Sequence, residues 1–201
     1  MNKIKQVAVF CSSSNALDEG FQDLAIELGR SLADGGYDLV FGGSNVGLMK
    51  IIADTMLESG RDVTGVIPQK IYDKGLGHES LSKLIVTEDM SARKKKLNEA
   101  SDAFIALPGG FGTLEEILEM ITLKQLQYHH KPIIFLDYQN FYQPLFELFD
   151  SFYRNRFAKP EYRNYFYRTE SISELMEHLK HYEKPDFKDK WYWVGSDQFK
   201  D

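Results

Sequence analysis

Short runs of apolar residues alternate with longer amphipathic segments along this chain, and turn residues or glycines separate them. Runs of four to eight apolar residues are typical of strands buried in a sheet. The amphipathic segments gather apolar side chains on one helical face, as Leu24, Leu28 and Leu32 do. We expect strands over residues 4–11, 37–41, 62–67, 83–87, 104–107, 132–136 and 165–168. We expect helices within 18–36, up to about 59, and over 90–100, 113–128, 141–155 and 173–182.

The alternation of strands and helices predicts a single α/β domain over residues 1–182. The expected architecture is Rossmann-like: a doubly wound, mainly parallel sheet with helices on both faces and ligands at the carboxyl ends of the strands. Residues 69–81 show no clear period, so they are expected to form a loop. The segment 183–201 is expected to be a charged tail. Its aromatic cluster, Trp191 to Trp193, should dock on this chain or on a partner, because such clusters seldom stay in solvent.

The most informative segment is 104-FIALPGGFGTLEE-116. Pro108 ends the apolar run, three glycines form a loop, and Thr113 is expected to begin a helix. Loop amides and a helix N-terminus, which carries roughly half a positive charge, together bind anions. The segment therefore predicts a phosphate-binding loop, although it matches neither the P-loop pattern nor the G-x-G-x-x-G dinucleotide pattern.

Thr113 and Glu116 allow two interpretations. The spacing T-x-x-E at a helix start is that of a capping box, in which Thr caps the helix and Glu reaches back to the N-cap amide. The alternative is that Glu116 takes part in chemistry, which the three preceding glycines favour because a simple cap does not need them.

Arg93 also allows two interpretations. Most helical arginines lie on the surface, but the stripe Met90, Arg93, Leu97 and Ala100 places Arg93 among apolar neighbours, while Lys94 to Lys96 fan away from it. A buried guanidinium requires an anionic partner, so a phosphate or a nearby carboxylate is expected beside Arg93.

The second glycine loop, 42-GGSNVGLM-49, is compatible with either tight packing or a role in the site. Cys11 is expected to be a small core residue. His129 and His130 are expected at a helix end, where cations are favoured. No group of His, Cys and carboxylate residues has metal-ligand spacing, so neither a metal nor a cofactor is predicted.

The composition restricts the partners. A net charge of −6 argues against nucleic acid or a lipid surface as a partner, because both require a basic face. One cysteine excludes an internal disulfide and fits a reducing cytoplasm. No run of about 18 apolar residues exists, and the first residues lead directly into a strand instead of a signal peptide. We therefore expect a cytoplasmic protein that is not bound to a membrane.

The string 108-PGGFGTLEE-116 resembles the pattern P-G-G-x-G-T-x-x-E of the Lonely Guy (LOG) family, cytokinin-activating nucleoside-monophosphate phosphoribohydrolases formerly labelled "possible lysine decarboxylases". The pair 93-RK-94 matches the Arg-Lys pair of that family. The resemblance implies that Arg93 and Glu116 are catalytic. It implies substrate contacts by Gly42, Gly43, Met90, Lys94, Gly109, Gly110, Phe111, Gly112, Thr113, Leu114, Glu115 and Thr122.

The resemblance further implies hydrolysis of the N-glycosidic bond of a purine or cytokinin nucleoside 5′-monophosphate, such as AMP, by a homodimer without a cofactor. Many members carry a glutamate three residues before a histidine between the third and fourth strands. This chain keeps His78 but has Gly75 at the glutamate position, which leaves the preferred base open. The alternative from another class is a non-catalytic nucleotide or molybdenum-cofactor carrier of the same fold.

Overall fold

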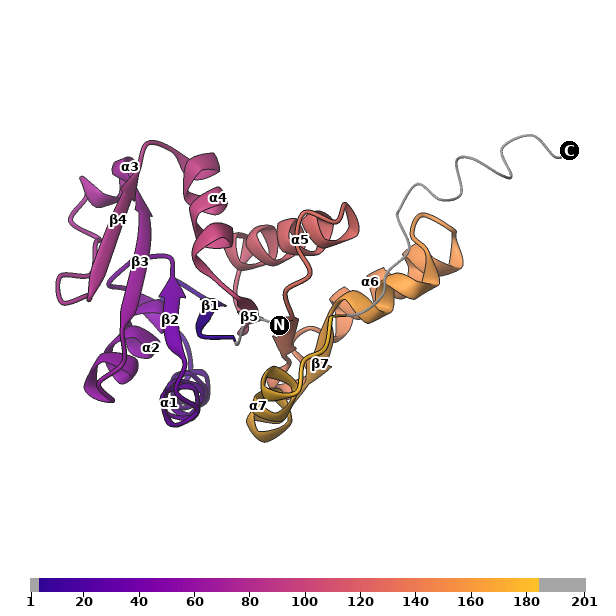
Figure 1. Cartoon of the computed structure of the whole chain (residues 1–201), viewed down its shortest axis with the longest axis horizontal. Helices are drawn as coiled ribbons and strands as arrows, with labels where there is room; N and C mark the ends of the chain where they lie inside the picture. Colours follow the sequence, from indigo (N-terminus) through magenta and orange to yellow (C-terminus); the bar gives the residue numbers. More distant parts are fainter. Residues whose placement is uncertain (1–3, 185–201) are drawn as a thin grey trace, which may run out of the picture.

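The computed structural model describes residues 4–184, which form one seven-stranded sheet in which every neighbouring pair of strands is parallel (Figure 1). The strand order is β4-β3-β2-β1-β5-β6-β7. The strands are β1 (Gln6–Phe10), β2 (Asp38–Phe41), β3 (Val63–Pro68), β4 (Lys83–Thr87), β5 (Ala103–Ala106), β6 (Ile133–Leu136) and β7 (Tyr167–Thr169). The predicted doubly wound α/β fold is confirmed.

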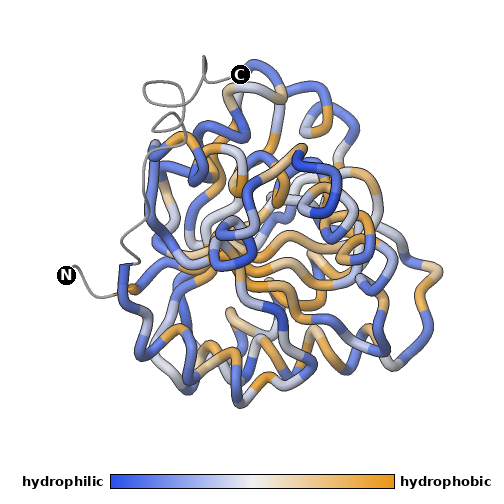
Figure 2. Tube along the Cα trace, turned by 90° about the vertical axis from the view of Figure 1, so that its right-hand side faces the viewer, coloured by the Kyte–Doolittle hydropathy of each residue, from blue (hydrophilic) through white to orange (hydrophobic). Residues whose placement is uncertain are grey.

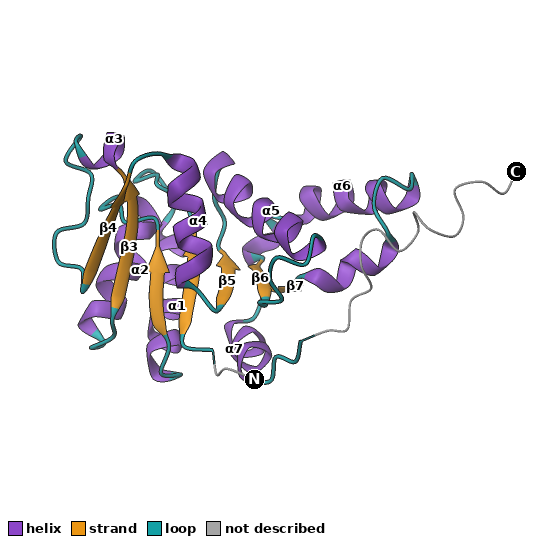
Figure 3. Cartoon of the chain, turned by 45° about the horizontal axis from the view of Figure 1, so that its top comes forward, coloured by secondary structure: helices purple, strands orange, loops and turns teal. Residues whose placement is uncertain are grey.

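Helices cover both faces of this sheet (Figures 1 and 3). The longer helices are α1 (Glu19–Asp34), α2 (Gly47–Glu58), α4 (Met90–Ala100), α5 (Phe111–Gln125), α6 (Gln143–Arg154) and α7 (Ile172–Lys180). Alternate residues of β1 point to opposite faces. Val7 and Val9 join the core beneath α1, α2 and α7, whereas Ala8 and Phe10 join the core beneath α4, α5 and α6. The strands therefore form an apolar layer between more polar helices (Figure 2).

The strand order reverses at β1. The chain runs outward from β1 through β2 and β3 to β4, and then returns to place β5 on the other side of β1. The connections after β1 and β5 therefore leave the sheet in opposite directions and open a crevice at the carboxyl ends of the strands. The glycine-rich loop predicted to bind phosphate follows β5 and therefore lies at this crevice.

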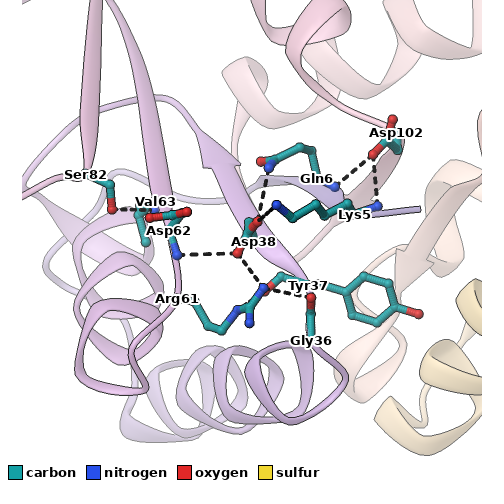
Figure 4. A network of polar contacts seen from close by, with 10 residues as sticks. All are labelled: Lys5, Gln6, Gly36, Tyr37, Asp38, Arg61, Asp62, Val63, Ser82 and Asp102. Atoms are coloured by element: carbon teal, nitrogen blue, oxygen red, sulfur yellow. Dashed lines mark hydrogen bonds and ion pairs between the residues drawn. The ribbon is translucent and has the colours of Figure 1, made fainter. Parts of the chain in front are cut away.

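A polar network ties together the opposite, amino ends of the strands (Figure 4). Asp38 at the start of β2 is 2% exposed and accepts a 2.5 Å bond from Nη2 of Arg61. Its second oxygen accepts from Nε2 of Gln6 at 3.2 Å and lies 3.4 Å from Nζ of Lys5. Asp102 accepts from the amides of Lys5 and Gln6. The network joins β1, β2 and the turn before β3 at the end of the sheet away from the crevice.

Some local predictions are wrong at particular residues. The stretch expected to be a loop begins with the short helix α3 (Gln69–Tyr72), which has too few residues to show a period. The two 3₁₀ turns, η1 (Tyr138–Asn140) and η2 (Pro160–Tyr165), were not predicted. Helix α5 ends at Gln125, so the two histidines lie beyond it. The predicted docking of the tail falls on residues outside the described range.

A position at a helix end would favour a protonated, cationic His129, but the structure holds this ring in its neutral form. It is 6% exposed, its Nε2 lies 2.9 Å from the carbonyl oxygen of Met120, and its Nδ1 accepts from the amide of Lys131 at 3.2 Å. Burial lowers its pKa to about 4. These bonds suit the neutral ring with the proton on Nε2, so His129 is a buried structural histidine.

Candidate active site

A cavity of about 690 Å³ opens at the crevice. Its walls come from the segments after β1, β2 and β3, from α4 and from the start of α5. The residues that line it are Cys11, Ser12, Ser13, Ser14, Gly42, Ser44, Val46, Met49, Ile67, Pro68, Ile71, Leu76, Met90, Arg93, Gly110, Phe111, Gly112, Thr113, Glu115 and Glu116. Another cavity of about 610 Å³ lies near β7, but neither glycine loop lines it. The crevice cavity is therefore the candidate site.

The N-terminus of α5 points free amides into this cavity. Gly110 is the N-cap, and its carbonyl accepts the amide of Leu114 at 3.1 Å. Within the described residues, the amides of positions 111–113 have no acceptor. A Cβ built on Gly110 or Gly112 would meet nothing within 4 Å, so the loop faces open space. This arrangement can bind an anion through backbone amides and the helix dipole.

The N-terminus of α2 also lies at the cavity, but its first amides are already bonded. The amide of Gly47 donates to Oδ1 of Asn15 at 2.7 Å, and that of Leu48 donates to the carbonyl of Ser12 at 3.0 Å. Gly47 has φ +59°, and a Cβ there would lie 2.5 Å from the backbone of Ser13. The loop after β1 thus binds the first two amides of α2, whereas among the described residues the first three amides of α5 have no acceptor.

Arg93 and Glu116 both line the cavity and form an ion pair with each other. Nη1 of Arg93 donates to Oε1 of Glu116 at 2.5 Å, and Nε donates to the carbonyl of Val66 at 3.0 Å. Both side chains belong to residues that are 8% exposed. The expected inward orientation of Arg93 is confirmed, and the carboxylate expected beside it is Glu116.

The pKa of Glu116 is raised. Burial is the largest cause, because it disfavours the charged carboxylate, and the Arg93 charge and hydrogen bond act in the opposite direction. Glu115 raises the pKa of Glu116 further and Lys94 lowers it. A buried carboxyl group whose pKa is shifted by burial and by neighbouring charges is a feature of catalytic sites.

The capping-box interpretation is wrong. Helix α5 begins at Phe111, two residues earlier than expected, and its N-cap is Gly110. Thr113 is therefore inside the first turn, where it is 3% exposed, and Glu116 is bonded to Arg93 instead of reaching back to the helix start. A Cβ on Gly109 would lie 2.1 Å from Oγ1 of Thr113, so this glycine lets the loop fold over the threonine.

The structure brings most of the predicted site residues to the cavity. Those that line it are Gly42, Met90, Arg93, Gly110, Phe111, Gly112, Thr113, Glu115 and Glu116. Met90 is 48% exposed and Phe111 is 93% exposed, so two large apolar side chains stand in solvent at the cavity.

Five predicted contact residues do not line the cavity within this chain: Gly43, Lys94, Gly109, Leu114 and Thr122. Lys94 is ion-paired with Glu115 and, at 3.2 Å, with Glu119, so it joins α4 to α5. Leu114 packs against the apolar core, and Thr122 is exposed on α5.

The segment 69–81, expected to be a loop, forms a wall of the cavity through two apolar residues that the sequence did not indicate. Ile71 and Leu76 line the cavity, and their segment is bonded to the second glycine loop. Oγ of Ser44 and the amide of Asn45 both donate to the carbonyl of Leu76, and the amide of His78 donates to that of Gly43. The segment follows the carboxyl end of β3, and a loop in such a position can reach the ligand in a parallel sheet, so its place in the chain was the signal that could have predicted this wall.

Two classes of feature are missing from the part of the chain that the structure describes. No group of three or more His, Cys, Asp or Glu residues within 4–184 is arranged to hold a metal ion. No helix in the same range is both long and apolar enough to cross a membrane.

The family model described as "Possible lysine decarboxylase" matches residues 49–179. LOG1 of Arabidopsis thaliana, a cytokinin riboside 5′-monophosphate phosphoribohydrolase, is 39% identical over 194 residues, which cover 94% of this chain and 91% of the relative. The chain belongs to the LOG family. LOGL2 of Oryza sativa subsp. japonica, named a probable enzyme of the same activity, is also 39% identical over 194 residues, which cover 94% of this chain and 80% of the relative.

Solved structures resemble the LOG-family fold of this chain at lower identity. The molybdenum cofactor binding protein from Rippkaea orientalis has a TM-score of 0.68 and 24% identity, covering 90% of this chain and 98% of that one. The molybdenum cofactor carrier protein from Chlamydomonas reinhardtii has a TM-score of 0.65 and 21% identity, covering 89% of this chain and 97% of that one. At these identities the likeness concerns the fold alone.

Proposed function

We propose that this LOG-family chain is a nucleoside 5′-monophosphate phosphoribohydrolase, which hydrolyses the N-glycosidic bond of a purine nucleotide to the free base and ribose 5-phosphate. The observation that carries the proposal is the buried Arg93–Glu116 pair beside the free amides of α5. The relatives named as cytokinin riboside 5′-monophosphate phosphoribohydrolases support the same reaction. A carrier would need the amides but has no use for the buried pair.

In this mechanism Glu116 faces the ribose. When the bond between C1′ and the base nitrogen breaks, the electron pair leaves with the base, which takes up a proton from solvent, and positive charge develops on the sugar. Water then adds at C1′. A carboxylate held there stabilises that charge or accepts the proton of the attacking water. Arg93 orients the carboxylate, because its guanidinium is fixed on one side by the carbonyl of Val66. A fixed carboxylate does not have to reorganise as the charge develops.

The 5′-phosphate is proposed to bind at the start of α5, where the amides of residues 111–113 have no acceptor among the described residues. Binding energy at the phosphate would then position the distant glycosidic bond against Glu116. Crystals soaked with AMP should place phosphate oxygens within hydrogen-bond reach of the Gly110, Gly112 or Thr113 amides. A phosphate bound elsewhere would remove this assignment.

The base preference is tested by incubation with a panel of purine and N6-modified purine monophosphates, followed by measurement of free base. Base should be released from the monophosphates and much less from nucleosides, which lack the positioning phosphate. Gly75 has φ +71°, and a Cβ there would meet no atom within 4 Å, so the panel decides whether its missing side chain changes the base selected. Absence of release from every monophosphate would refute the proposed reaction.

We further propose that the enzyme is a cytoplasmic homodimer with its cavities near the interface. The exposed Met90 and Phe111 beside the cavity support a protein contact there, since such side chains favour burial. Light scattering should give twice the 23.2 kDa mass of one chain. A monomer at micromolar concentration would contradict the assembly without affecting the reaction.

A further inference from the structure

Gly42 lies where three elements meet around the guanidinium of Arg93. It follows β2, whereas Arg93 belongs to α4 and Glu116 to α5. A Cβ built on Gly42 would lie 2.6 Å from Nη2 of Arg93 and 2.8 Å from Sδ of Met49. Both distances are shorter than real Cβ contacts, so a side chain at position 42 would force its neighbours to move.

The two neighbours differ in their freedom to move. Met49 is an unbranched, partly exposed side chain at the cavity wall and can change rotamer. Its movement would leave the 2.6 Å contact with Arg93 in place. Nη1 and Nη2 of Arg93 belong to one planar group, so a displacement at Nη2 also moves the nitrogen that bonds Glu116.

Gly42 is required for space and not for its backbone angles. Its φ lies outside the left-handed region, unlike that of the next residue, Gly43, which has φ +75°. An alanine at position 42 is therefore compatible with the local backbone. Its methyl group would disturb only the side chains that it meets, those of Arg93 and Met49. This property separates Gly42 from the other glycine of the pair.

We propose that Gly42 is a positioning residue for the reaction: its missing side chain leaves the space in which the Arg93 guanidinium faces Glu116. Its role differs from contact with the nucleotide, the role implied by the family pattern. The kinetic part of the inference rests on the proposed function, but the structural part does not. The glycine loop after β2 is then one wall of the space that holds the Arg93 guanidinium.

The test is Gly42→Ala, compared with wild type, and Gly42→Ala combined with Met49→Ala, compared with the single variant Met49→Ala, because Met49 itself lines the cavity and its own effect has to be subtracted. In the double variant the new methyl group at position 42 no longer meets the Met49 sulfur but still meets Nη2 of Arg93. Any effect that remains in the double variant is therefore due to Arg93 and not to crowding at Met49. Crystal structures of both Gly42 variants should show Nη1 of Arg93 beyond about 3.5 Å from Oε1 of Glu116. With AMP, kcat should fall by about tenfold or more while KM changes little.

The pH dependence of kcat/KM provides a second test, because a general structural defect would lower kcat/KM without shifting its dependence on pH. Arg93 lowers the pKa of Glu116 against the effect of burial, so its displacement should shift the acid limb of kcat/KM to higher pH. An undisplaced guanidinium, a raised KM with kcat preserved, or recovery of turnover by Met49→Ala would each overturn the inference. If the wild-type chain releases no base, the proposed function fails, whereas the crystal structures still decide the role of Gly42.

Discussion

Replacement of Glu116 by glutamine tests the proposed mechanism most directly, because the two side chains have nearly the same shape and differ in charge. In the wild-type chain, Oε1 of Glu116 lies 2.5 Å from Nη1 of Arg93, and both residues are 8% exposed. Glutamine keeps an oxygen acceptor for that bond. It removes the negative charge that we place beside C1′ of the ribose.

The effect on stability should be small. Removing one member of a buried ion pair costs about 3–5 kcal/mol when the other charge is left without a partner. Here Arg93 keeps the Val66 carbonyl and the amide oxygen of glutamine, and burial already disfavours the carboxylate, as its raised pKa indicates. We therefore expect the free energy of unfolding to fall by about 1–2 kcal/mol, well within the 5–15 kcal/mol of a typical domain.

The effect on turnover should be large. Loss of charge stabilisation in a buried site costs roughly 10²-fold or more in rate, equivalent to about 2.7 kcal/mol of transition-state stabilisation. The assay is release of adenine from AMP, with nucleotide binding measured by calorimetry and folding by thermal denaturation. Glu116→Gln should fold, bind AMP and release almost no adenine.

Glu119→Gln is the matched control on the same helix. Glu119 lies one turn beyond Glu116, is ion-paired with Lys94 at 3.2 Å and does not line the cavity. Its variant should keep turnover within about twofold of wild type. If Glu116→Gln retains more than about half of the wild-type rate, Glu116 does not carry the reaction and the proposed mechanism is wrong.

Two further predictions concern stability. The pKa of His129 falls from its usual 6.5 to about 4 on folding, so the unfolded chain binds more protons than the folded chain between these two pH values. The free energy of unfolding should therefore fall by up to about 3 kcal/mol as the pH drops from 6.5 to 4. Urea titrations of His129→Gln should show a weaker pH dependence than those of the exposed control His181→Gln, and equal slopes would contradict the assignment. Asp38→Asn should lower the free energy of unfolding by about 2 kcal/mol, since it leaves the partly exposed Arg61 without its anion. Its turnover should match wild type, because the network lies at the opposite end of the sheet from the cavity.

Hydrophobic periodicity determined the elements of this fold and the class to which it belongs. The central strands β1, β2, β5 and β6 are short runs of mainly apolar residues and each covering helix has an apolar face, so both signals lie within a few consecutive residues. The glycine loop after β5 was readable for the same reason, because proline, glycines and a helical pattern follow one another directly. Short elements such as α3 were missed, since four residues hold too little of a period.

The sequence by itself therefore determined the main strands and helices, where the glycine-rich loop after β5 lies and that Arg93 faces inward. Only the tertiary structure decided between capping and ion pairing for Glu116, because Arg93 is 23 positions away and reaches it across the crevice. It also decided that Gly42 makes room for the guanidinium. The physical reason is that local pattern depends on neighbours along the chain. Contacts between side chains depend on strand order and on the depth at which each element packs, which no short stretch of sequence encodes.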